Sequence, residues 1–152
     1  MGKKVTAMLL RPGKEAELIR IRPSFEKIEE LVGGTADFTW PFNDRICVVV
    51  NDTGKLDGLP LNRALRDRGG RIVDIYAGDI VILGCGKRGG FVDLEEDEIG
   101  KLFKRFGKPE FGWKTEEFRE KDAGKSGVAG VVVGKVDSFE DLMKLLKDVY
   151  EK

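Results

Sequence analysis

Two short runs of consecutive apolar residues constrain the fold most strongly. Residues 46–50 read ICVVV and residues 80–84 read IVILG, and both are rich in β-branched side chains. A strand with one face in water alternates apolar and polar residues, whereas a strand covered on both faces is apolar throughout. Each run therefore predicts a central strand, and we expect both to lie inside one sheet.

The segments around these runs predict further strands and helices. Residues 3–10 and 15–21, separated by Pro12 and Gly13, predict a hairpin. Apolar residues at helical spacing predict helices over 24–32, 95–106 and 138–151. Together these elements predict an α+β fold, with a single mixed, mostly antiparallel sheet of five to seven strands and about three helices.

The first predicted helix has sequence signals at both ends. Ser24 is a favourable N-cap, and the glycine pair at 33–34 can end the helix in the left-handed conformation. Its expected apolar face comprises Phe25, Ile28, Leu31 and Val32. The segment TADFTWPF follows as a strand, and we expect its Trp40 and Phe42 to pack in the core or at its rim.

The composition removes several kinds of chemistry. The 152 residues include no His, and 27 basic side chains balance 27 acidic ones. Without His, the chain itself cannot form a Ser-His-Asp or Cys-His catalytic group or supply a zinc imidazole ligand. Balanced charge argues against general nucleic-acid binding. We therefore expect no catalytic residue, no metal site and no cofactor, and we favour a non-enzymatic protein.

The N-terminal residues and the cysteines bear on where the protein works. The first ten residues lack the long apolar segment of a signal peptide, and no run of 18 apolar residues occurs. We therefore expect a cytoplasmic protein with no membrane partner. Cys47 lies inside an apolar run and is expected to be buried and inert, while Cys85 lies near a strand end. Their spacing matches no recognised redox motif.

The stretch NDTGKLDGLPLNRAL, residues 51–65, is the strongest candidate for a binding site. Its DTG triplet is typical of a hairpin loop with a positive φ at Gly54, and residues 61–67 fit one helical turn. Across residues 55–71, five Lys or Arg side chains and two Asp leave a local charge of +3. Arg suits recognition of phosphate or carboxylate, and loops often carry binding residues. The candidate ligand-binding residues are Asn51, Lys55, Asn62, Arg63 and Arg66.

The same stretch has a purely structural interpretation. In that interpretation Asn62 caps backbone groups and Arg63 pairs with a carboxylate, so the stretch is a corner of the fold. The sequence leaves both interpretations open.

Three other patterns are weaker candidates. AGKSG at 123–127 resembles part of a phosphate-binding loop, but Arg119 stands where that loop needs its first Gly. Asp74 and Asp79 have no third ligand spaced to complete a cation site. The acidic residues at 95–98 start a helix, where they complement its dipole.

Several segments together resemble an uncharacterised protein family. They are ELVGG at 30–34, WPF at 40–42, ICVVVNDTGKLDGLPLNRAL at 46–65, DIYAGDIVILG at 74–84 and FVDLEEDEIGKLFKRFG at 91–107. The family is a domain of unknown function found in phages, plasmids and integrated mobile elements, mainly of Gram-positive bacteria. The resemblance covers about residues 4–111 and implies no activity, cofactor or catalytic residue. We therefore expect a family-like domain over 1–111, with a connector and strand-helix extension over 112–152 packed on it.

Three functions remain open at this point. We favour a phage or mobile-element accessory protein that binds a host or element protein without catalysis. The alternatives are a binder or sequestering protein for a small anionic ligand such as a nucleotide signal, and a His-independent enzyme. A pocket bordered by Asn51, Lys55 and Arg63 would favour the small ligand, and an exposed apolar patch would favour the protein partner. A buried carboxyl with a strongly shifted pKa in a cleft would favour the enzyme.

Overall fold

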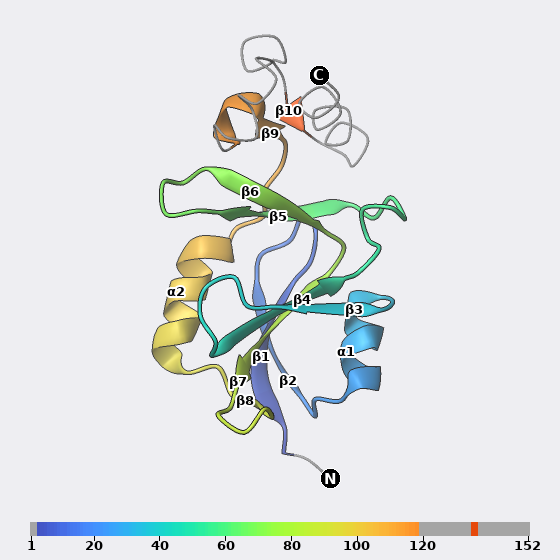
Figure 1. Cartoon of the computed structure of the whole chain (residues 1–152), viewed down its shortest axis with the longest axis vertical. Helices are drawn as coiled ribbons and strands as arrows, with labels where there is room; N and C mark the ends of the chain where they lie inside the picture. Colours follow the sequence, from blue (N-terminus) through green and yellow to red (C-terminus); the bar gives the residue numbers. More distant parts are fainter. Residues whose placement is uncertain (1–2, 119–134, 137–152) are drawn as a thin grey trace.

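The computed structural model describes residues 3–118 and 135–136, and its centre is a six-stranded antiparallel sheet (Figure 1). In spatial order the strands are β2 (Glu17–Ile21), β1 (Val5–Leu10), β7 (Ile80–Cys85), β4 (Ile46–Asn51) and β3 (Ala36–Thr39), with β8 (Phe91–Val92) paired to β7. The two apolar runs are the adjacent strands β4 and β7, with Val48 opposite Ile82. Both are interior strands, and β1 and β2 form the predicted hairpin.

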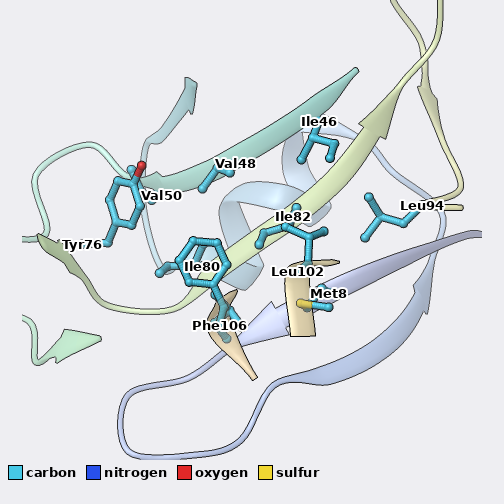
Figure 2. Close-up of a cluster of buried hydrophobic side chains, with 11 residues drawn as sticks. Met8, Ile46, Val48, Val50, Tyr76, Ile80, Ile82, Leu94, Leu102 and Phe106 are labelled. Atoms are coloured by element: carbon cyan, nitrogen blue, oxygen red, sulfur yellow. The ribbon is translucent and has the colours of Figure 1, made fainter. Parts of the chain in front are cut away.

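A helix covers each face of this sheet, which explains why β4 and β7 are apolar throughout. α1 (Phe25–Val32) packs on one face and α2 (Glu96–Phe106) on the other (Figure 1). Successive residues of β4 alternate between the two layers, with Val48 on the α2 side and Val49 on the α1 side. Figure 2 shows the core on the α2 side, which includes Met8, Ile82, Leu102 and Phe106.

The ends of α1 form as the sequence predicts, but one residue of its expected apolar face is exposed. The Ser24 hydroxyl oxygen accepts a hydrogen bond from the Lys27 N–H at 3.0 Å, and Gly33 ends the helix at a φ of 78°. Ile28 is buried as expected. Phe25, at the first helical position, is 72% exposed, because its ring meets Phe38 on the edge strand β3 instead of entering the core.

A second, two-stranded sheet corrects the expectation of a helical turn at residues 61–67. β5 (Leu61–Arg66) pairs with β6 (Ile72–Ala77) in antiparallel orientation, and this pair lies beyond one end of the main sheet (Figure 1). Its apolar side chains form a small separate core with Trp113 and Phe118. Pairing and burial here outweigh the helix propensity of Leu, Arg and Ala. The structure thus adds a small sheet to the predicted one.

The connection between β4 and β5 is not the predicted hairpin, because these two strands belong to different sheets. The positive φ also falls elsewhere, on Gly58 at 73° and not on Gly54. Gly54 is required for a different reason, since a Cβ there would lie 2.9 Å from the Ala77 carbonyl oxygen. The stretch from Asn51 to Gly58 therefore carries the chain from the main sheet to the second sheet.

The predicted acidic start of α2 has the structural role expected for it. The side chains of Glu95 and Glu98 form a capping box at the start of the helix. Glu98 also forms an ion pair with Arg45, with 2.9 Å between carboxylate oxygen and Nε. This ion pair ties the start of α2 to Arg45, which directly precedes β4.

Beyond α2 the chain forms β9 (Trp113–Lys114) and a short 3-10 turn, η1 (Thr115–Glu117). β9 pairs with β10 (Lys135–Val136), which lies within the strand-helix extension expected over 112–152. Outside the described residues lie the predicted helix over 138–151 and the AGKSG segment. The division at residue 111 stays a prediction. None of the described helices has the length and apolar character needed to cross a membrane.

Candidate functional site

Two clefts open on opposite faces of the edge strand β3. The acidic cleft, of about 630 Å³, is lined by Asp37, Thr39, Trp40, Pro41, Val50, Asn51, Asp52, Lys55, Leu56, Leu65, Asp74, Tyr76 and Ala77. The aromatic cleft, of about 1110 Å³, is lined by Phe25, Phe38, Trp40, Asn43, Asp44, Arg45, Cys85, Gly86, Lys87, Gly89 and Phe91. Side chains alternate along a strand, so Asp37 and Thr39 face one cleft while Phe38 faces the other. Trp40 lines both.

Carboxylates dominate the charge of the acidic cleft. Asp37, Asp52 and Asp74 line it together with a single cation, Lys55, which leaves an excess of two negative charges. Lys55 forms an ion pair with Asp74. Within the described residues, no ion pair engages Asp37 or Asp52, and no three potential ligands gather closely enough to hold a metal ion. The cleft therefore favours a cationic organic group over an anion.

Tyr76 connects the acidic cleft to the hydrophobic core. Its ring belongs to the cluster on the α2 side, next to Val50 (Figure 2), and it also lines the cleft. Burial, reinforced by the negative charge of Asp74, raises the pKa of Tyr76 to about 12. The hydroxyl therefore keeps its proton at neutral pH and is a hydrogen-bonding group there, not a base.

Asn51 lines the acidic cleft, but its amide group is used by the fold. Its Nδ2 donates to the Val32 carbonyl oxygen at 3.1 Å, and its Oδ1 accepts from the Thr53 N–H at 2.9 Å. A Cβ at Gly34 would lie 2.9 Å from this Nδ2. Asn51 therefore locks the end of α1 to the turn after β4. This position of the Asn51 side chain requires a glycine at position 34.

Asn62 and Arg63 lie inside the protein, away from both clefts. Both side chains are fully buried. Asn62 Nδ2 donates to the carbonyl oxygens of Leu10 at 2.9 Å and Gly78 at 2.8 Å. Its Oδ1 accepts from Arg63 Nη1 at 2.7 Å. We term this pair the buried corner, because it joins β5 to the end of β1 and to the turn before β7.

Arg63 extends the buried corner to the end of α2. Its guanidinium donates to the carbonyl oxygens of Phe106 at 3.0 Å, Arg11 at 3.3 Å and Lys14 at 2.7 Å. Phe106 is the last residue of α2, so the cation lies at the negative end of the helix dipole. Burial lowers the pKa of Arg63, and the charge of Glu110 opposes that shift. The acceptors of Arg63 are thus three backbone carbonyls and the Asn62 amide oxygen, in place of the carboxylate expected from the sequence.

Arg66 occupies a third environment. Its guanidinium lies 3.3 Å from carboxylate oxygens of both Glu110 and Glu117, which ties β5 to the segment after α2. The structure thus brings two of the five candidate residues, Asn51 and Lys55, to one cleft and places the other three elsewhere. Binding of a ligand by any of the five stays a prediction.

The aromatic cleft presents several aromatic rings to solvent. The Phe38 ring meets Phe25 edge-on at 5.7 Å and stacks on Phe91 at 6.1 Å, measured between ring centroids. Trp40 is 50% exposed, and its Nε1 donates to the Cys85 sulfur at 3.3 Å. Such rings supply large apolar contact area with defined geometry.

Cys47 on β4 lies opposite Leu83 on β7, two residues from Cys85, and the two cysteines form no disulfide. Burial, with a smaller contribution from Cys85, raises the pKa of Cys47 to about 12. Cys47 is therefore the buried, inert thiol that the sequence predicts. Cys85 is partly exposed at the aromatic cleft.

Sequence reasoning missed the aromatic cleft. The prediction that Trp40 and Phe42 pack in the core or at its rim is confirmed for Phe42, which packs against Phe106 at 6.0 Å between ring centroids. Trp40 instead borders both clefts. The rings of the aromatic cleft come from α1, β3 and β8, and their positions from 25 to 91 share no local pattern. Only the pairing of strands brings them together.

These features define a small α+β protein with an open cleft on each side of an edge strand. The chain belongs to the family described as a domain of unknown function, DUF3846, whose family model matches residues 5–107. The matched region runs from β1 through α2 and contains both clefts. No curated protein and no solved structure matches the chain.

Proposed function

We propose that this protein is a non-enzymatic accessory protein of a phage or mobile element, and that it acts by binding a protein of the host or of the element. The placement of exposed apolar side chains carries the proposal. Of six exposed large apolar residues in the described chain, three line the two clefts beside β3, namely Phe25, Trp40 and Leu56. Exposed apolar surface bordered by polar residues is typical of protein interfaces.

The shape and charge of the clefts support a protein partner over a small anion. The clefts lie on two faces of one strand and share Trp40, so an occupant that touches both must extend along β3. The excess negative charge of the acidic cleft opposes an anionic ligand. Asn62 and Arg63, which resemble an anion site in sequence, direct their donors to backbone carbonyls.

The polar groups of the clefts also suit binding better than catalysis. The chain has no His, Lys55 is paired with Asp74, and Tyr76 keeps its proton at neutral pH because its pKa is about 12. General acid–base catalysis needs a group that exchanges its proton near the working pH. The setting in a phage or mobile element rests on the family resemblance over residues 4–111.

Affinity capture from host cells, with and without the genetic element, tests this function. The variant Phe25→Ser/Leu56→Ser removes two exposed apolar side chains from the clefts. Leu18→Ser is a matched control, because Leu18 is 46% exposed on β2 at the opposite edge of the same sheet. We expect one or a few proteins to be retained by the wild type and the control and lost from the double variant. Recovery of the same proteins by all three would contradict the proposal.

A further inference from the structure

The open edge of β3 indicates how a partner could be held. Among the described residues, β3 is the last strand of its sheet. The Thr35 carbonyl oxygen accepts from the Asp52 N–H at 2.8 Å on the β4 side, whereas the Ala36 N–H donates away from β4 to a Glu29 carboxylate oxygen at 3.2 Å. These directions alternate along an antiparallel strand. The N–H and C=O of Phe38 therefore both point away from β4, toward the open edge.

The two clefts lie where the side chains of an added strand would point. A strand placed along β3 alternates its side chains between the two faces of the sheet. One set would enter the aromatic cleft beside Phe38, and the other would enter the acidic cleft beside Asp37 and Thr39. Trp40, the residue after β3, borders both sets.

We propose that β3 accepts an extended segment of the partner protein as an additional strand, and that this segment alternates apolar with basic side chains. The proposal rests on the protein-binding function above and specifies its mode. In strand addition, backbone hydrogen bonds supply affinity, and pockets for alternate side chains supply specificity. Here Phe38 offers the backbone groups, and the two clefts are the pockets.

Charge complementarity identifies the basic side chains of the segment. The acidic cleft carries Asp37, Asp52 and Asp74 against Lys55 alone, so a Lys or Arg entering it meets an excess of negative charge. Arg has the further advantage that its planar guanidinium can stack on the half-exposed Trp40 ring. The aromatic cleft selects large apolar side chains through Phe25, Phe38 and Phe91.

A second copy of this chain fits the edge less well. Pairing of β3 with β3 would bring Asp37 of each copy to the edge that already carries the acidic cleft of the other. Like charges placed close together across paired strands are destabilising. The charge pattern therefore favours a basic segment from a different protein.

A synthetic nine-residue peptide that alternates Ile and Arg is the probe for this proposal. Binding is followed through tryptophan fluorescence, because Trp40 borders both clefts while Trp113, the other tryptophan, is 2% exposed. A peptide of the same composition, with its Ile and Arg residues in two blocks, controls for simple charge attraction. We expect the alternating peptide to bind at least about tenfold more tightly than the block peptide, since only it can place both side-chain types and the backbone bonds together.

Methylation of backbone nitrogens in the peptide tests whether its backbone pairs with β3 or only its side chains make contact. In antiparallel addition, the residue opposite Phe38 shares its face and directs its N–H to β3. Methylation of the Ile residues should therefore weaken binding about tenfold, through loss of one or two hydrogen bonds, while methylation of the Arg residues leaves it nearly unchanged. Weaker binding only when the backbone nitrogens of the Arg residues are methylated would indicate that the segment adds in parallel orientation. Equal effects of the two methylations would overturn the proposal.

Protein variants test the assignment of each cleft. Asp37→Asn should lower the affinity for the alternating peptide about threefold and reduce the salt dependence of binding, as expected for a partly exposed ion pair. Phe25→Ser should weaken it more, and Leu18→Ser should not. Circular dichroism melting checks that each variant is folded. Peptide binding that is indifferent to both Asp37→Asn and Phe25→Ser would show that the peptide lies elsewhere and would overturn the proposal.

The outcomes distinguish this mode from the proposed function itself. If capture of a cellular partner depends on Phe25 and Leu56 but the alternating peptide neither binds nor displaces that partner, the protein-binding function stands and strand addition is wrong. If the peptide binds as expected but no captured protein depends on these side chains, strand addition stands and the proposed function fails. A concentration-dependent dimer that Phe25→Ser abolishes would assign the edge to a second copy and overturn the basic partner.

Discussion

The surface around β3 and the buried corner around Arg63 use their residues in opposite ways. At β3, aromatic side chains such as Phe25 and Trp40 are half or more exposed, and the acidic cleft next to them leaves Asp37 and Asp52 without ion pairs among the described residues. At the corner, the polar side chains of Asn62 and Arg63 are fully buried and hydrogen-bonded. The comparison shows that residue type alone does not locate a binding surface.

The reason for the inversion at the corner lies in the backbone. The Phe106 carbonyl oxygen lies at the end of α2, where helical carbonyls have no donor within the helix. Arg63 donates to it and to two carbonyl oxygens of the turn between β1 and β2, on Lys14 and on Arg11, which also accepts from the Lys14 N–H at 3.1 Å. A buried carbonyl without a donor costs about 1–3 kcal/mol. An arginine is therefore used here to complete the hydrogen bonding of the fold.

The largest effect that would test this contrast is the loss of the buried guanidinium. Arg63→Ala leaves a cavity, removes the guanidinium donor from the Phe106 and Lys14 carbonyls, and leaves the Arg11 carbonyl with its turn donor only. We expect the free energy of unfolding to fall by about 3 kcal/mol or more. Urea denaturation of wild type and variant measures the difference. Arg68→Ala is the matched control, because Arg68 is exposed in the same charged stretch and should change stability by less than about 0.5 kcal/mol.

The outcome also bears on the anion-binding alternative for Arg63. Unchanged stability of Arg63→Ala would remove the distinction between the corner and the β3 surface. In that case Arg63 would return as a candidate ligand contact.

Asn62→Ala should have the next largest effect. Asn62 bridges the carbonyls of Leu10 and Gly78 and also orients Arg63. We expect a loss of about 2 kcal/mol, because two buried carbonyls lose their donor. The double variant Asn62→Ala/Arg63→Ala should lose less than the sum of the two single losses, since the two side chains form one network. Strict additivity would show that the two residues act independently.

Much of the fold could be predicted because its determinants are local or periodic. The two apolar runs define interior strands, since only a strand covered on both faces is apolar throughout. Ser24 and Gly33 mark the ends of α1 through capping that involves neighbouring residues only. The family resemblance over residues 4–111 likewise agrees with the matched region, 5–107.

The candidate site could not be predicted to the same extent because it depends on long-range pairing. Residues 61–66 contain good helix formers, yet they form β5 because β6 and Trp113 cover them. This change from helical turn to strand buries Asn62 and Arg63 and dissolves the expected cluster of positive charge. Conversely, the aromatic cleft depends on which strand forms the edge of the sheet, and no local signal specifies that edge.

The smallest expected effect concerns Asp79, which adjoins the corner just after Gly78. Burial raises the pKa of the Asp79 carboxyl, and the charges of Arg11 and Lys14 oppose that shift. Asp79 thus binds its proton more tightly in the folded protein than in the unfolded chain, where its pKa is about 3.9. Ionisation therefore destabilises the fold. This cost is absent well below pH 3.9 and grows as the pH rises through the higher folded value.

Asp79→Asn should remove the destabilisation caused by the ionised carboxylate. An ordinary exposed polar turn would show no such effect. We expect the variant to be more stable than wild type at neutral pH, with the difference vanishing as the pH falls below about 3.9, because both proteins then carry an uncharged side chain at this position. Urea denaturation of the pair at several pH values measures the difference directly, and acid effects common to both proteins cancel. The opposite trend, with wild type gaining stability relative to the variant as pH rises, would mean that Arg11 and Lys14 outweigh burial. The surroundings of the buried corner would then favour an ionised carboxylate at Asp79. In that respect the corner would resemble the β3 surface, which also carries charged carboxylates.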